Sequence, residues 1–326
     1  MLESLQHPSG LFSASRKDVK TGYNMAWIRD NVYIALGLEA TQKTKELRKT
    51  YRALLDIFKK HEYKIDWMIH EPNPKMAFRY IHARFDPLTK NEINELWGNK
   101  QNDAIGAVLF KIGQLERKGI RIICNDSDLR IVKKLVAYLG AIEYWRDEDN
   151  GMWEENEEVH ASSVGACLAG LKSISTVVDV PQEIIEYGQE ALNSLLPCES
   201  ETKETDLALL SLIYPYNIVT PEQREKILHN IETQLVRKKG AIRYKGDKYY
   251  GNGHEAEWVF GFPWLAIIYK MLNIPGRYAY YMKKTLQSAN SKGELPELYY
   301  GGTEKHNENS PLGWAQALYL VAAVEA

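Results

Sequence analysis

The stretch Asp126-Ser-Asp-Leu-Arg-Ile-Val-Lys-Lys-Leu-Val-Ala-Tyr-Leu-Gly-Ala-Ile-Glu-Tyr144 decides the fold class of this chain. Its apolar residues recur three or four positions apart, as Leu135, Tyr138 and Leu139 do, and this spacing places them on one face of an α-helix. Asp126 is a common helix-start residue. The stretch therefore predicts an amphipathic helix over residues 126–144.

Similar segments fill most of the chain on both sides of this helix, and many begin with an entry signal such as Thr220-Pro-Glu. The predicted helices span residues 27–41, 43–61, 102–118, 126–144, 159–175, 182–197, 204–213, 220–237, 255–273, 276–290 and 311–326, with a stub at 2–6 as a twelfth. Alternating side chains favour two short strands, within residues 76–84 and 241–244.

The connections between these helices differ in length. Four are long and rich in Gly, Asn and aromatics: residues 62–101, 145–158, 239–254 and 291–310. Short loops at one end and long loops at the other suit a toroid of helical hairpins with a pocket at its long-loop end. An α-solenoid is the alternative, but the chain has no fixed-period repeat. No linker or low-complexity segment divides the chain, so we expect one domain over residues 1–326.

The composition excludes several partners. The chain has 41 basic and 43 acidic residues and no basic stripe, so nucleic acid is not an expected ligand. Its three cysteines form no CxxC pair, which argues against a disulfide framework and for a reducing compartment. The first 20 residues contain no apolar signal-peptide core, and no stretch is long and apolar enough for a membrane span. We therefore expect a cytoplasmic protein without a membrane partner.

The first cluster of candidate site residues is Ala26-Trp-Ile-Arg-Asp-Asn31, at the start of a predicted helix. Arg29 and Asp30 can grip neighbouring sugar hydroxyls with charge-assisted hydrogen bonds, and Trp27 offers an aromatic face. The helix dipole favours Asp30 as an anion. The alternative is a helix cap with a salt bridge and a core tryptophan.

The second cluster is Leu96-Trp-Gly-Asn-Lys-Gln-Asn-Asp103, again just before a helix. Trp97 can stack on a sugar ring, and Asp103 can bind a hydroxyl. The alternative is a capped turn, because Asp is a common capping residue.

The third cluster, Gly151-Met-Trp-Glu-Glu-Asn156, suits acid catalysis. Glycosidic cleavage needs a carboxylic acid that stays protonated until it meets the leaving oxygen. Packing against Trp153 and repulsion from Glu155 would both raise the pKa of Glu154. The alternative is a solvated acidic loop before a helix.

Two further loops supply a base and a sugar subsite. Glu297, which follows a proline in Gly293-Glu-Leu-Pro-Glu-Leu-Tyr-Tyr-Gly-Gly302, can activate a water as a general base. Arg243 begins an aromatic, glycine-rich stretch that leads to Trp258. The alternatives are a surface turn and an ordered loop.

Cofactor motifs are incomplete. Gly251-x-Gly253 lacks the third glycine of a dinucleotide fingerprint, and His254-Glu255-Ala-Glu257 lacks the second histidine of a zincin. The sequence contains no P-loop and no GxSxG. Residues 147–151 hint at a calcium loop, but the glycine comes one place early. We therefore expect no cofactor and no metal.

The order of the clusters is more specific than any one of them. Trp27-x-Arg29-Asp30, Trp97-Gly-x-x-Gln101-x-Asp103, Trp153-Glu154-Glu155, Arg243-Tyr244 and Pro296-Glu297 resemble the signature of family 15 glycoside hydrolases, such as glucoamylases and glucodextranases. The resemblance implies an all-α (α/α)6 barrel, here with a truncated first helix, and inversion at the anomeric carbon. It implies Glu154 as general acid, Glu297 as general base, and an α-glucan or gluco-oligosaccharide as substrate. The implied or candidate substrate-binding residues are Trp27, Arg29, Asp30, Trp97, Asp103, Trp153, Glu155, Arg243 and Trp258.

A second resemblance keeps another function open. Gly10-Leu-Phe-Ser-Ala-Ser15, Ala161-Ser-Ser-Val-Gly165 and Leu295-Pro-Glu-Leu-Tyr299 are similar to the N-terminal domain of phosphorylase kinase α and β subunits, which is related to family 15. That resemblance implies a glucan-binding regulatory domain with little or no turnover. A helical scaffold without a sugar site is a third interpretation.

Overall fold

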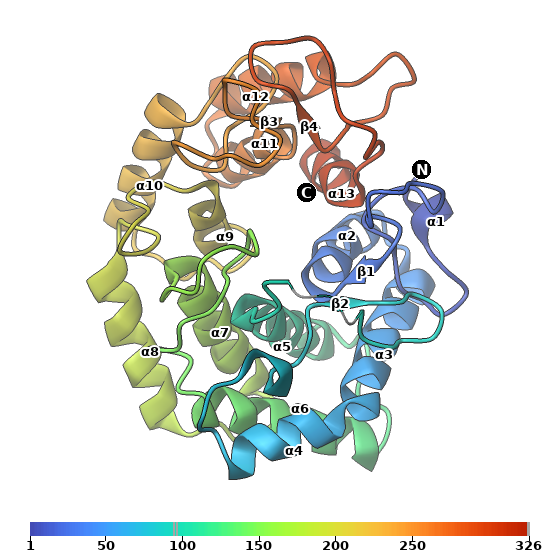
Figure 1. Cartoon of the computed structure of the whole chain (residues 1–326), viewed down its shortest axis with the longest axis vertical. Coiled ribbons are helices and arrows are strands. Elements are labelled where there is room, and N and C mark those ends of the chain that lie inside the picture. Colours follow the sequence, from blue (N-terminus) through green and yellow to red (C-terminus); the bar gives the residue numbers. More distant parts are fainter. Residues whose placement is uncertain (94, 96, 325–326) are drawn as a thin grey trace.

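Helices pair into a ring in this protein (Figure 1). The computed structural model describes residues 1–93, 95 and 97–324. Within them, successive inner helices pack side by side, and the last of them, α13, packs against the first, α2. The inner helices are α2 (Ile28–Ala40), α5 (Asn102–Arg117), α7 (Ala161–Ile174), α9 (Leu210–Ile213), α11 (Gly261–Met271) and α13 (Gly313–Ala323).

Each inner helix has an outer partner (Figure 1). The outer helices are α3 (Thr44–Lys60), α6 (Asp126–Ala141), α8 (Gln182–Leu195), α10 (Pro221–Gln234), α12 (Pro275–Gln287) and α1 (Leu2–Leu5). The pairs are α2 with α3, α5 with α6, α7 with α8, α9 with α10, α11 with α12, and α13 with α1. This arrangement confirms the predicted all-α six-hairpin fold, and the four-residue α1 is the truncated first helix.

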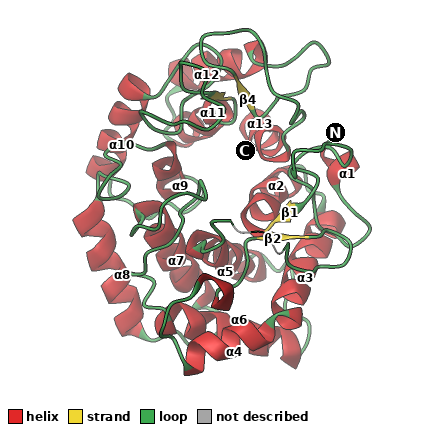
Figure 2. Ribbon diagram, viewed as in Figure 1, coloured by secondary structure: helices red, strands yellow, loops and turns green. Residues whose placement is uncertain are grey.

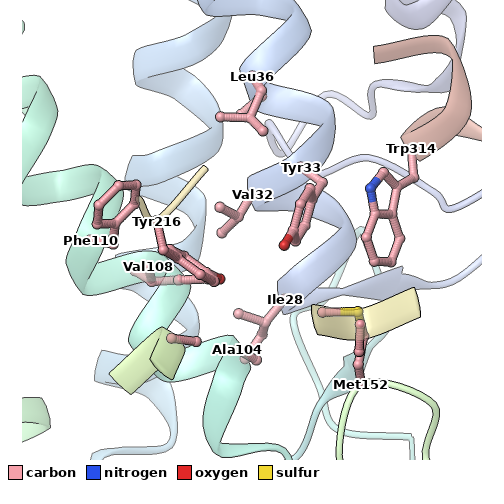
Figure 3. Close-up of a cluster of buried hydrophobic side chains, with 14 of the residues drawn as sticks. Ile28, Val32, Tyr33, Leu36, Ala104, Val108, Phe110, Met152, Tyr216 and Trp314 are labelled. Carbon is pink, nitrogen blue, oxygen red and sulfur yellow. The ribbon is translucent and has the colours of Figure 1, made fainter. Parts of the chain in front are cut away.

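Burial separates the two rings. In α6, the stretch that decides the fold class, Asn125 caps the helix by accepting a hydrogen bond from the Asp128 N–H, and the apolar face, including Leu135 and Leu139, is buried. The inner helices are buried nearly all round, as α7 is from Ala161 to Leu171. Side chains fill the middle of the ring between α2 and α5, where Figure 3 shows a packed cluster that continues up to Met152 and Trp314.

Glycines let α5 and α7 touch through their backbones. A Cβ atom on Gly106 would lie 2.4 Å from the carbonyl carbon of Ala166, and one on Gly170 would lie 2.4 Å from the carbonyl oxygen of Gly106. A Cβ atom on Gly113 would lie equally close to the carbonyl oxygen of Ser173. Any side chain at these positions would push the two helices apart.

The Gly106→Ala variant is therefore expected to lose about 1–3 kcal/mol of unfolding free energy, the usual cost of overpacking. Denaturant titration measures it. The matched control is Gly140→Ala on α6, where the nearest atom, a methyl group of Ile184, would lie 3.8 Å from the new Cβ. That variant should be neutral or gain up to about 1 kcal/mol, because Ala favours helix over Gly. Equal stability of the two variants would contradict the close contact.

Several predicted elements differ from the structure. Residues 62–101 were expected to form a loop, but α4 (Glu62–His70) lies there and packs on α6. The sequence pattern misses α4 because it spans only nine residues, of which three are buried. Residues 76–84 form a 3-10 turn, η1 (Ala77–Arg79), before the short strand β2 (Arg84–Phe85), which pairs antiparallel with β1 (Ala26–Trp27). Figure 2 marks these short strands in yellow.

The helices predicted at 204–213 and 255–273 start late. The first begins with a 3-10 turn, η2 (Leu207–Leu209), which Asp206 caps, and continues as α9. The second begins at Gly261, because β3 (Glu257–Trp258) pairs with β4 (Leu298–Tyr299). The predicted strand at 241–244 is reduced to single bridges, from Ala241 to Val236 and Trp258 and from Tyr244 to Asp206. The predicted ends of the last helix, at 325–326, and Leu96 of the second cluster lie outside the described residues. In the described part of the chain, no helix is both long and apolar enough to cross a membrane.

Candidate active site

The inner helices begin around one pocket of about 190 Å³. The residues at the starts of α2, α11 and α13 line it directly, so the positive ends of three helix dipoles face the same space. Its aromatic lining is Tyr23, Trp27, Trp97, Trp153, Tyr249, Trp258, Phe260 and Trp314. Its polar lining is Thr21, Arg29, Asp30, Arg84, Glu154 and Arg243. Aromatic faces combined with a few charged groups suit a sugar better than an apolar ligand.

Arg29 joins two of the predicted clusters. Its Nη1 donates to both carboxylate oxygens of Asp103, at 3.1 and 3.2 Å, and to Gln101 Oε1 at 2.8 Å. Its Nη2 donates to Glu154 Oε1 at 3.3 Å. Asp103 is 1% exposed and does not line the pocket. The structure therefore places Asp103 behind Arg29, where it holds the guanidinium and is out of reach of a ligand in the pocket.

Glu154 has the environment of a carboxylic acid that stays protonated. Burial raises its pKa to about 8, against the opposing effect of the Arg29 cation. The nearby charge that adds to the rise is Asp30. The repulsion that was predicted from Glu155 comes from Asp30, while the charge of Glu155 is offset by Lys203 and Arg243. Glu154 adopts a positive φ of 65°, and its carbonyl lies too close to Gly98 for a side chain there.

Asp30 lines the pocket beside Glu154. No other side chain of the described residues hydrogen-bonds to its carboxylate, which leaves it available to a ligand. Burial raises its pKa to about 6, and the Arg29 cation opposes this effect. The expectation that the helix start would simply favour the anion is therefore outweighed by burial.

Arg243 and Glu155 form a second charged assembly. Asp247 accepts two hydrogen bonds from Arg243, both at 2.7 Å, and Glu155 accepts a third from Nη2 at 2.9 Å. Lys203 and Tyr244 also donate to Glu155, and its pKa is lowered, because the cations outweigh its burial. Arg243 lines the pocket but Glu155 does not. Glu155 is thus placed to orient Arg243.

Glu297 is fully buried and does not line the pocket. Tyr23 donates a short hydrogen bond to its Oε1, while Asn307 and Asn309 donate to Oε2, the latter at 2.8 Å. Burial raises the pKa of Glu297, and these three donors oppose the rise by favouring the carboxylate. Tyr23 lines the pocket, so Glu297 contacts a pocket residue without lining the pocket itself.

The tryptophans form two walls. On one side Trp27 contacts Tyr23 and Trp97, with ring centroids 5.4 and 6.0 Å apart. On the other side the Trp153 ring is nearly parallel to Phe260 and Trp314, and its Nε1 donates to Asp206 at 2.7 Å. Trp258 completes that wall, with the Arg243 guanidinium 5.0 Å from its ring centroid.

The structure thus brings together eight of the eleven predicted site residues at the pocket surface: Trp27, Arg29, Asp30, Trp97, Trp153, Glu154, Arg243 and Trp258. Asp103, Glu155 and Glu297 lie behind them. Sequence reasoning missed Tyr23, Arg84, Asn307 and Asn309. Tyr23 is only three residues before the first cluster, so aromatics near that cluster were a usable signal. Asn307 and Asn309 carried no recognisable sequence signal, because asparagines are common in loops.

Comparisons with known proteins identify the family and the fold. The family model described as glycosyl hydrolases family 15 matches residues 1–257. A probable phosphorylase b kinase regulatory subunit alpha from Caenorhabditis elegans is 30% identical over 76% of this chain and 23% of its own length. The liver isoform of that subunit from Mus musculus is 27% identical over 98% of this chain and 32% of its own length. The chain thus spans about a quarter to a third of the length of these relatives.

Solved structures share the fold. A wild-type glycosidase matches with a TM-score of 0.85 at 18% identity, covering 99% of this chain and 93% of the other. A variant glycosidase in complex with glucose matches equally well, with a TM-score of 0.85. A glucoamylase from Hormoconis resinae gives 0.69 at 14% identity, covering 98% and 70%. With a family model that matches most of its length, the chain belongs to glycosyl hydrolases family 15.

Proposed function

We propose that this chain is an inverting hydrolase that releases glucose from the non-reducing end of α-glucosides. The observation that carries the proposal is Glu154, a pocket carboxyl whose pKa of about 8 keeps it protonated at neutral pH. A general acid needs this property, and an ordinary surface glutamate does not have it. Family membership and the glycosidase structures with the same fold support the reaction class.

In the proposed mechanism the two carboxyls have opposite charge states. Glu154 donates its proton to the glycosidic oxygen, and Arg29 then stabilises the carboxylate that forms. Glu297 is the base and takes a proton from the water that attacks the opposite face of the sugar; the hydrogen bonds from Tyr23 and the two asparagines favour its carboxylate form against the burial that raises its pKa. Inverting pairs are roughly 6.5–9.5 Å apart so that this water fits.

Substrate binding is assigned to the charged groups that face the pocket. The Asp30 carboxylate can accept hydrogen bonds from sugar hydroxyls, and Arg243 can donate to them, since Asp247 and Glu155 occupy only its Nε and Nη2. Trp27 and Trp153 enclose the ring. The unpaired cysteines Cys124, Cys167 and Cys198 support a cytoplasmic location, and the single ring of hairpins supports one domain over residues 1–326.

A second candidate is a glucan-binding regulatory domain with little or no turnover. Two observations favour it. The curated relatives are described as regulatory subunits. Glu297 is also 0% exposed, and its carboxylate accepts hydrogen bonds from Tyr23, Asn307 and Asn309, an environment that also suits a purely structural carboxylate.

The deciding experiment is incubation with maltose, isomaltose, trehalose and soluble starch, with the released sugar followed by proton NMR. The hydrolase proposal predicts that the glucose cleaved at its anomeric carbon appears first as the β-anomer, because a single displacement inverts the α-linkage. Soluble starch gives the decisive reading, because its leaving group is the remaining chain, and initial α-glucose from starch would contradict inversion. Maltose and isomaltose also release a reducing-end glucose as an anomeric mixture, and inverting cleavage of trehalose releases one β-glucose and one α-glucose. Binding detected by calorimetry without any glucose release would favour the regulatory domain.

A further inference from the structure

Three guanidinium groups line the pocket, and they differ in how their charge is balanced. Arg29 is paired with Asp103, whose side chain is 1% exposed, and Arg243 is paired with the buried Asp247. Arg84 is paired with Glu95, whose side chain is 65% exposed. Solvent and mobile ions screen an exposed partner, so Arg84 is the least neutralised of the three cations.

Arg84 is nevertheless held firmly. It lies on β2 directly opposite Trp27 of β1 in the antiparallel register. Its guanidinium carbon lies 5.3 Å from the centroid of Trp27 and 4.8 Å from that of Trp97. These contacts fix the guanidinium at the pocket surface, whereas its own carboxylate partner sits outside on an exposed side chain.

One nitrogen of Arg84 is kept accessible by a glycine. Gly22 has a positive φ of 88°, and a Cβ atom there would lie 3.3 Å from Nη1 of Arg84. No hydrogen-bond acceptor for Nη1 occurs among residues 1–93, 95 and 97–324, whereas Nη2 donates to Glu95. The Arg84 guanidinium therefore has a donor available to a ligand.

Arg84 packs on Trp97, and the neighbour of Trp97 in the chain packs on the loop that carries Glu154. The residue after Trp97 is Gly98, and a Cβ atom there would lie 2.8 Å from the Glu154 carbonyl oxygen. The wall that holds Arg84 is thus the wall against which the Glu154 loop packs. In the proposed reaction Glu154 gives its proton to the leaving group, so the Trp97 and Arg84 part of this wall is assigned to the leaving group, while Trp27, Asp30 and Arg243 serve the glucose that is released.

A neutral leaving sugar does not need a cation whose only ion-pair partner in the described residues is an exposed carboxylate. The chemistry that a fixed, planar guanidinium recognises best is a carboxylate or phosphate, which can accept two hydrogen bonds from it. We propose that Arg84 makes the pocket select α-glucosides whose leaving group carries an anionic group, a carboxylate or a phosphate. The inference rests on the proposed function, because it names the leaving group of the proposed reaction.

The test compares pairs of ligands in which one member carries an added anionic group on the leaving sugar. Maltobionate is compared with maltose, and trehalose 6-phosphate with trehalose. Affinities are measured by calorimetry in the full-length Glu154→Gln variant, which prevents turnover, and kcat/KM is measured in the wild type. At least one anionic ligand should bind about tenfold more tightly than its neutral match, the size expected for one charge-assisted hydrogen bond. Whichever pair shows the preference identifies the anionic group.

Variants at Arg84 assign the preference. Arg84→Met, which keeps the packing on Trp27 and Trp97, should abolish it, and Arg84→Lys should retain part of it. Arg130→Met is the control, because Arg130 is an exposed arginine on the outer helix α6 and its removal should change nothing. If Arg84→Met does not fold, salt provides the same test, since raising ionic strength should weaken anionic but not neutral ligands.

The outcomes separate the two proposals. Equal affinities within both pairs, or a preference that survives in Arg84→Met, overturns the role of Arg84 even if maltose is hydrolysed. A preference for the anionic ligands that depends on Arg84, together with no glucose release from any ligand, supports the proposed role of Arg84 and overturns the proposed hydrolase activity.

Discussion

Replacing Glu154 by Gln is expected to lower kcat/KM by about 10²- to 10⁴-fold on natural disaccharides, the usual contribution of a general acid. The Gln side chain can still accept the hydrogen bond from Arg29 but has no proton to give to a leaving oxygen. The measurement is steady-state release of glucose from whichever disaccharide the wild type cleaves. Activated substrates with acidic leaving groups, such as aryl glucosides, should lose much less, because their departure needs little protonation.

Glu148→Gln is the matched control, since Glu148 is an exposed glutamate in the same loop and should keep wild-type turnover. The pH profile provides a second check on the same carboxyl. With the pKa of Glu154 at about 8, the active protonated form dominates below that pH and is lost above it. The kcat/KM of the wild type should therefore fall about tenfold per pH unit on the alkaline side. A Glu154→Gln variant with wild-type turnover would show that another group supplies the proton.

The Glu297→Gln variant is expected to lose about 10²- to 10⁴-fold in kcat, here on natural and activated substrates alike. A base that activates water is needed whatever the leaving group, so the two variants should differ in how they respond to an activated substrate. This difference distinguishes the acid from the base. Turnover on aryl glucosides and on maltose measures it.

Because Glu297 is fully buried, its replacement needs a check on folding. Thermal unfolding should show a folded variant, since a Gln side chain can still accept hydrogen bonds from Tyr23 or the asparagines through its oxygen. Glu308→Gln, an exposed glutamate between Asn307 and Asn309, tests whether loss of charge in this loop matters by itself. A folded Glu297→Gln variant that retains wild-type kcat would remove Glu297 from the mechanism and require another base.

The site was most predictable where function follows from neighbours in the chain. Trp153 and Glu154 are adjacent, and Arg29 and Asp30 begin one helix, so local patterns place them correctly at the pocket. The burial of Asp103, by contrast, depends on Arg29, which is 74 residues away. The hydrogen bond to Glu297 Oε1 comes from Tyr23, which is 274 residues away. No local pattern carries such information, because the two partners meet only after the ring has formed.

The fold shows the same division. Long amphipathic helices such as α3 and α6 were predicted within a few residues, since hydrophobic spacing over several turns is a strong signal. The short α4 was missed, and the pairing of β1 with β2 could not be seen, because a two-residue strand owes its existence to the partner opposite. That pairing matters for the proposed site, because it places Trp27 and Arg84 opposite each other at the pocket.

The backbone contact between α5 and α7 has a consequence for how freely this protein can change. Gln101 and Asp103, at the start of α5, hold Arg29, and the loop that carries Glu154 runs into α7. Arg29 and Glu154 are 125 residues apart in the chain, yet the helices that support them meet without side chains between them. Changes in the packing of the outer helices should therefore alter the distance between Glu154 and Arg29 very little. We expect a library randomised on the exposed faces of α8, α10 and α12 to vary widely in melting temperature while its folded members keep the alkaline limb of the wild type.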